Sequence, residues 1–170
     1  MDSVAHRAGD LGREWLAAVA VPQVRSSLEA IYSLISDQVE ARGPACWASG
    51  RCCNFANAGH RLYVTGLEAA YAVSLAGINI TESDIDAAIL RGDCPYLVGN
   101  LCGIHASKGI GCRVYFCDRS ARDWQELLSE RAIKIVRSVH EEHGIPYEYG
   151  EWRRMLREVV LGSANPQLEC

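Results

Sequence analysis

A cluster of cysteines is the feature that most constrains this chain of 170 residues. Seven of its eight cysteines lie between residues 46 and 117, namely Cys46, Cys52, Cys53, Cys94, Cys102, Cys112 and Cys117. Thiols gathered in this way in a reducing compartment more often bind a metal than form disulfides. Adjacent side chains of an extended segment point to opposite faces, so Cys52 and Cys53 can share one centre only where the backbone turns. The eighth cysteine, Cys170, lies far from the cluster in sequence and is expected to take no part.

The overall composition predicts one globular domain over residues 1–170. Hydrophobic residues make up 49% of the chain and charged residues 22%. A net charge of -4 argues against nonspecific binding to nucleic acid. No run approaches the ~20 apolar residues of a membrane span. The first fifteen positions include five charged side chains, whereas a signal peptide has an apolar segment there. We therefore expect a cytoplasmic protein with no membrane segment.

Helical periodicity dominates the rest of the sequence and predicts a mainly α fold. Proline at the start and glycine at the end of several apolar repeats mark where the helices begin and stop. Only one short strand is expected, over 61–64. The expected helices cover about 10–21, 22–43, 65–77, 81–92, 124–144 and 150–161.

Two loops, 43–60 and 93–118, hold all seven clustered cysteines. The expected architecture is a small helical domain whose two cysteine-rich loops are joined by a metal centre, with little regular strand. Residues 46–118 form the metal-binding core, and 1–45 and 119–170 supply flanking helices. The loops are expected to hold too few apolar residues to become ordered without the metal, so the site contributes directly to folding.

The cysteine spacing leaves two kinds of metal open. Two C-x2-C pairs would indicate a structural zinc ribbon, and the chain contains no C-x2-C. Iron-sulfur sites tolerate irregular spacing because separate loops can supply the ligands. Zinc uses the same thiolate chemistry and stays open. Familiar catalytic motifs, such as a phosphate-binding loop or H-E-x-x-H, are absent from the sequence.

The pattern of residues 46–118 resembles the YkgJ-type cysteine-cluster family, whose zinc- or iron-chelating domain is named for a CxxCxxCC signature. Cys46, Ser49 and Cys52-Cys53 keep that spacing, with serine at the second cysteine position. The family's second half is similar to Cys94-Pro95-Tyr96-Leu97, Cys102-Gly103-Ile104-His105, Cys112-Arg113 and Cys117. The chain departs from the pattern at Ser49, at His105, where tyrosine is usual, and at 108–111. The resemblance implies a cysteine-bound metal centre, and flagellin lysine methylases carry a similar domain.

The serine at position 49 raises the question of an incomplete centre. Seven thiols can make one site of four and one of three, or a single four-ligand site with three spare thiols. His105 could add a neutral imidazole ligand, or it is a loop histidine that bonds to backbone. A metal with an open position can bind substrate or activate water, whereas loss of one ligand by drift is equally simple.

Three further groups of residues have a plain structural interpretation beside a functional one. A pair of histidines, His140 and His143, is expected to form a solvated helix cap rather than a metal site. Three arginines are expected to balance thiolate charge rather than to bind an anion, namely Arg113, Arg119 and Arg122. Three aromatic residues are expected to pack in the core rather than to line a pocket, namely Tyr147, Tyr149 and Trp152.

Three functions are therefore considered. The first is a cytosolic metalloprotein that binds an iron-sulfur cluster or iron through the seven cysteines, in a redox or cofactor-dependent role. The second is a zinc-stabilised helical module that binds another protein. The third is a tailoring enzyme with an open-site metal at Ser49 and His105. The expected partner is another protein or a small molecule.

Overall fold

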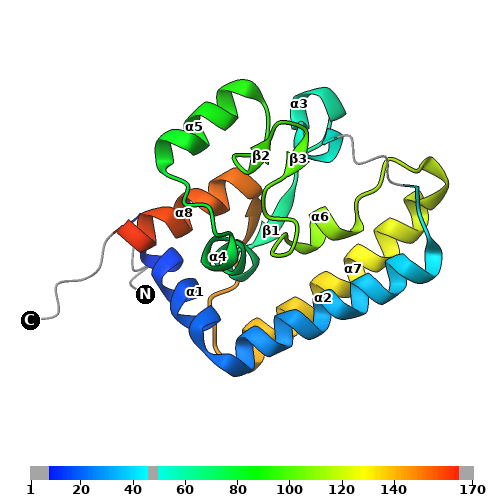
Figure 1. The fold of residues 1–170 in the computed structure, drawn as a ribbon. Coiled ribbons are helices and arrows are strands. Elements are labelled where there is room, and N and C mark those ends of the chain that lie inside the picture. The colour runs from blue at the N-terminus through cyan, green and yellow to red at the C-terminus, as the bar shows by residue number, and fades with distance from the viewer. Residues whose placement is uncertain (1–7, 46–49, 165–170) are drawn as a thin grey trace, which may run out of the picture.

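Helices make up most of the structure, a computed structural model that describes residues 8–45 and 50–164. The mainly α fold predicted from the sequence is confirmed, and each of the six expected helices is present. They are α1 (Asp10–Ala20), α2 (Pro22–Arg42), α4 (Gly66–Leu75), α5 (Glu82–Arg91), α7 (Arg122–Glu142) and α8 (Trp152–Ala164) (Figure 1). Within the described part of the chain, no helix is long and apolar enough to cross a membrane.

The helices form two groups that share one core. Helices α1, α4 and α8 pack against one another, and the long helices α2 and α7 lie side by side and antiparallel (Figure 1). The backbones of α1 and α8 touch, because an added Cβ at Gly12 would lie 2.0 Å from the Glu158 oxygen. Trp15 is fully buried, and its indole N–H donates to the Pro146 carbonyl at 2.8 Å. These contacts fix the frame from which the cysteine loops extend.

Strands are few and short, as the sequence predicted, but only β1 of the four strands in the described residues was expected. Strand β1 (Tyr63–Thr65) pairs antiparallel with β4 (Tyr149–Glu151), with Val64 opposite Gly150. The last helix therefore begins at Trp152 rather than near Gly150, because residues 149–151 are extended. A second pair, β2 (Leu97–Val98) with β3 (Leu101–Cys102), forms a hairpin inside the second cysteine loop.

The two cysteine loops contain short helices and buried apolar side chains. Their helical segments are η1 (Arg51–Cys53), α3 (Phe55–Ala58), α6 (Ile110–Val114) and η2 (Arg119–Ala121). Buried apolar residues of the loops include Phe55, Tyr96, Ile104, Ile110 and Val114. The expectation that the loops hold too few apolar residues to become ordered is therefore wrong, since these side chains belong to the main core.

A buried carboxylate connects the helical frame to the second loop. Glu68 is 1% exposed, and its Oε2 accepts hydrogen bonds from the backbone N–H of Thr65 at 2.8 Å and from the Thr65 hydroxyl at 2.9 Å. Its Oε1 accepts from the backbone N–H of Ile110 at 2.8 Å, at the start of α6. Burial raises the pKa of Glu68, although these hydrogen bonds oppose the rise. One side chain thus caps α4 and holds α6.

The chain offers a matched test of this connection, because Thr81 and Asp84 form a second capping box that is exposed. We expect Thr81→Ala to lower the free energy of unfolding by about 1 kcal/mol, the usual value for a helix cap. Thr65→Ala should cost about 2–3 kcal/mol, because it also removes a donor from a buried carboxylate. Denaturant unfolding of the two variants measures the difference, and equal losses would show that burial of the box adds nothing.

His140 is buried in the helical frame, so its interpretation as a solvated helix cap is wrong. It is 1% exposed, and its Nδ1 donates to the carbonyl of Pro146 at 3.0 Å and to that of Ile145 at 3.3 Å. Its Nε2 is buried without a hydrogen-bond partner among the described residues. Burial lowers the pKa of His140, and the two carbonyls oppose this only in part. His143, in contrast, is exposed at the end of α7.

The lowered pKa of His140 predicts an acid-sensitive fold. The unfolded chain takes up the proton near pH 6.5, and the folded chain does so only at lower pH, so stability is lost as the pH falls below about 6.5. The slope from this one group is at most about 1.4 kcal/mol per pH unit. Denaturant unfolding across this range should show a smaller slope in His140→Gln than in wild type, whereas the exposed control His143→Gln should keep the wild-type slope. An unchanged slope in His140→Gln would contradict the assignment.

Candidate metal centre

The first loop brings its two adjacent cysteines onto one helical turn. Cys52 and Cys53 lie on η1, which begins after Gly50, a residue with φ 65°. The structure thus shows the backbone turn that the sequence required if the pair was to share a centre. Gly50 also approaches the hairpin, because a Cβ there would lie 2.5 Å from the Asn100 carbonyl oxygen. Cys52 is exposed and Cys53 is buried.

Backbone hydrogen bonds join the second loop to the first. The Cys94 N–H donates to the Cys53 carbonyl at 2.9 Å, and the Ala56 N–H donates to the Gly92 carbonyl at 2.9 Å. Gly92 is the left-handed residue that ends α5, so the chain turns there toward the first loop. These bonds place the two loops side by side and bring Cys94 next to Cys53.

Four thiols meet around Cys53. The thiol of Cys53 interacts with those of Cys102, Cys52 and Cys94, and these contacts raise its pKa. The same interactions with Cys53 lower the pKa of Cys52 and of Cys102 to about 6, and they also lower the pKa of Cys94. A thiol that donates a hydrogen bond to a neighbouring sulfur stabilises negative charge on that sulfur. A metal cation replaces thiol protons, so the donor set suits a cation.

The sulfurs are gathered around one of their own number rather than around an ion position. Among the described residues, no group of three or more His, Cys, Asp or Glu side chains is already arranged to hold a metal ion. A shared ion would therefore require the four thiols to turn from Cys53 toward a common centre.

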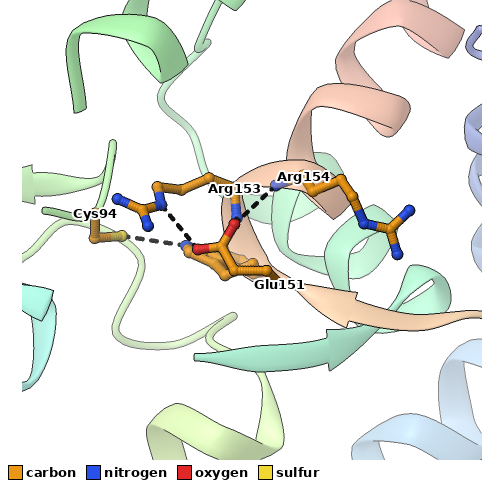
Figure 2. Close-up of polar contacts among 5 residues, drawn as sticks. Cys94, Glu151, Arg153 and Arg154 are labelled. Carbon is orange, nitrogen blue, oxygen red and sulfur yellow. Dashed lines mark hydrogen bonds and ion pairs between the residues drawn. The ribbon is translucent and has the colours of Figure 1, made fainter. Parts of the chain in front are cut away.

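Helix α8 supplies a hydrogen bond to one of these sulfurs. The indole N–H of the fully buried Trp152 donates to the Cys94 sulfur at 3.3 Å (Figure 2). Glu151 holds the start of α8, since its carboxylate accepts from the backbone N–H groups of Arg153 at 3.0 Å and Arg154 at 3.2 Å. The Arg153 side chain also donates to Glu151 at 2.8 Å. A rigid helix end therefore places a donor against Cys94.

Cys112, on helix α6, is a further thiol near this group. Burial raises the pKa of Cys112, and the thiols of Cys94, Cys102 and Cys52 raise it further. The position of Cys112 depends on Glu68, which bonds to the backbone of Ile110 two residues earlier. Cys112 is thus a fifth thiol within electrostatic range of the other four.

A cavity of about 400 Å³ adjoins these thiols. Cys52, Cys53, Cys102 and Cys112 all contribute to its lining. His105 and Lys108 line it too, and the Lys108 ammonium lies 3.2 Å from the His105 Nε2. The charge of Lys108 lowers the pKa of His105 and contributes to the lowering at Cys52 and Cys102.

The remaining predicted ligands are placed differently or lie outside the described residues. Cys117 is partly buried and lines an adjoining cavity of about 440 Å³ together with Arg119 and Arg122. His105 contacts the side chain of Lys108, whereas its structural interpretation was a bond to backbone. Cys46, Ser49 and Cys170 lie outside the described residues.

The arginine and aromatic candidates have different roles in the structure. Arg113 donates to the carbonyls of Lys108 and Ala106 at 2.8 Å each, and its guanidinium lies 4.1 Å from the centre of the Tyr32 ring. It therefore serves packing of the second loop. Trp152 is core, as expected, whereas Tyr147 and Tyr149 are 38% and 42% exposed and are not core residues.

Sequence reasoning missed two residues at the site. Lys108, one of the two lysines of the chain, lies between Cys102 and Cys112, and that position was the available signal. Trp152 is distant from every cysteine of the cluster in sequence, so no local pattern could have paired it with Cys94. Lys108 supplies positive charge near the thiols, which the arginines were expected to do, and Trp152 donates a hydrogen bond to the Cys94 sulfur.

Comparisons of the chain with protein-family models, with curated proteins and with solved structures find no match. The resemblance of residues 46–118 to the YkgJ-type family therefore remains a prediction from the sequence pattern.

The Trp152 hydrogen bond can be tested by Trp152→Phe, which keeps an aromatic ring and removes the N–H. Substitution of a group that donates a hydrogen bond to a metal ligand commonly lowers metal affinity by about 10–100-fold. We expect Trp152→Phe to lose bound metal to a competing chelator about tenfold more readily than wild type. Trp124→Phe, a half-buried tryptophan on α7, is the matched control and should behave as wild type. Equal retention in both variants would exclude a role of the indole N–H at Cys94.

Proposed function

We propose that this protein is a metalloprotein that binds an iron-sulfur cluster or iron through Cys52, Cys53, Cys94 and Cys102, in a redox or cofactor-dependent role. The observation that carries the proposal is the meeting of these four thiols from two loops around Cys53. Thiolates are the usual ligands of iron-sulfur clusters, which accept ligands from separate loops. Free thiols also require a reducing compartment such as the cytoplasm.

The surroundings of the four sulfurs support a centre rich in negative charge. Hydrogen bonds to cysteine sulfur and nearby charges tune the potentials of such clusters. Here the Trp152 N–H donates to Cys94, and the Lys108 ammonium lies near Cys52 and Cys102. When bound, an iron-sulfur cluster supplies one-electron transfer. The residues of the chain would hold it, offset its charge and keep water from its Cys94 side.

A zinc-stabilised module that binds another protein is the second candidate. It is favoured by the hairpin that carries Cys102, because Val98 and Leu101 at its tip are 61% and 66% exposed. Exposed apolar side chains beside a structural zinc site are suited to a protein partner. The third candidate, a tailoring enzyme with an open-site metal, is favoured by the cavity next to the thiols.

Anaerobic purification followed by absorption spectroscopy and elemental analysis tests the proposal. We expect a coloured protein that contains iron, because iron-sulfur clusters absorb visible light and zinc does not. Cys53→Ser and Cys94→Ser should lose most of the metal, since both thiols are central and buried. The comparison variant Cys117→Ser should keep most of it, because Cys117 lines a different cavity.

The outcomes separate the candidates. Stoichiometric zinc without colour would favour the zinc-stabilised module over the iron-containing protein. No bound metal in wild type would reject all three candidates. Loss of metal in Cys117→Ser to the same extent as in Cys53→Ser would reject the proposed set of four cysteine ligands.

A further inference from the structure

The cavity beside the thiols has the size and lining of a small-molecule site. Its volume of about 400 Å³ falls within the usual range of ligand pockets, about 300–1,000 Å³. Its walls come from the first loop, the β2–β3 hairpin, α6, α7 and both strands of the β1–β4 pair. Since several elements of the fold form its walls, the cavity does not depend on one loop alone.

Aromatic and apolar side chains form the wall away from the sulfurs. The rings of Tyr63 and Tyr149 are stacked with centroids 5.9 Å apart, and those of His60 and Tyr115 are stacked at 4.5 Å. The buried Leu62, which lies between His60 and Tyr63 in the sequence, lines the cavity as well. Such a surface is suited to a flat apolar group.

Two cations, Lys108 and Arg61, and one carboxylate, Glu126, line the cavity, and the charge of Lys108 acts on the thiols of Cys52 and Cys102. The Lys108 side chain contacts only the His105 ring among the hydrogen bonds seen within residues 8–45 and 50–164, and no carboxylate there forms an ion pair with it. The charge of Lys108 lowers the pKa of His105, which favours the neutral imidazole. A neutral imidazole can accept a hydrogen bond from the ammonium and does not attract an anion away from it. The ammonium can therefore donate to an acidic group in the cavity.

We propose that this cavity binds a small organic anion, with a carboxylate or similar group on Lys108 and a flat apolar body against the aromatic wall. The bound molecule would contact the thiols that line the cavity, which are Cys52, Cys53, Cys102 and Cys112. Binding of the anion needs no metal, whereas its use as a ligand or substrate of the sulfur centre rests on the proposed function.

Calorimetric titration with 1-naphthoate, and with the neutral 1-naphthalenemethanol, tests the site. Lys108→Met should weaken naphthoate binding about tenfold or more, because a hydrogen bond to a charged group is lost, and should leave binding of the alcohol nearly unchanged. Lys134→Met removes the only other lysine of the chain, an exposed residue of α7, and should bind both probes as wild type does. Ser129→Trp, which fills the cavity from α7, should abolish binding of both.

Other outcomes would overturn the inference. These are absence of naphthoate binding to wild type, equal naphthoate affinity in wild type and Lys108→Met, or unchanged binding in Ser129→Trp. Metal content measured in the same samples keeps the two proposals apart. If wild type binds naphthoate but holds no metal, this inference stands and the proposed function is rejected. If wild type holds iron but binds no naphthoate, the proposed function stands and this inference is rejected.

Discussion

The pair of loops depends on the backbone hydrogen bond from Cys94 to Cys53 and on the parallel bond from Ala56 to Gly92. These bonds need no particular side chain, yet they bring together two segments that α4 and α5 separate in the sequence (Figure 1). Once Cys94 lies beside Cys53, the turn of η1 carries Cys52 to the same place, and the hairpin brings Cys102. The thiol group is thus a consequence of how the loop backbones pair.

The helical frame then restricts where each loop can lie. Glu68 extends from α4 to the backbone of Ile110 and so positions the helix that carries Cys112. Trp152, at the start of α8, donates a hydrogen bond to the Cys94 sulfur. A buried polar group is costly unless its partners are in place, so both side chains favour a single arrangement of the second loop. A metal bound at the proposed centre would therefore act on loops that the core already orders.

Local sequence patterns predicted the long helices but not the contacts that define the site. The repeat around Leu28, Ile31 and Ile35 depends only on neighbouring turns, so α2 could be predicted from the sequence. Strand β4 has three residues, one of them Gly150, and exists because β1 pairs with it. The cysteine cluster itself was visible in the sequence. Which thiols meet, and that Lys108 rather than Arg113 lies near them, depends on tertiary packing.

Burial is uneven across the four thiols, and this asymmetry limits how the proposed centre could work. Cys94 and Cys53 are 5% and 7% exposed, whereas Cys52 is exposed. Cys52, Cys53 and Cys102 line the cavity, and Cys94 does not. Trp152 would cover the Cys94 side of a centre held there, and the cavity offers a ligand a route to the other sulfurs. The residues that control access are then Lys108 and the aromatic wall rather than the metal ligands. Substitutions in that wall should alter which molecule binds and leave metal retention to the cysteines, which makes the two properties separable in one chain.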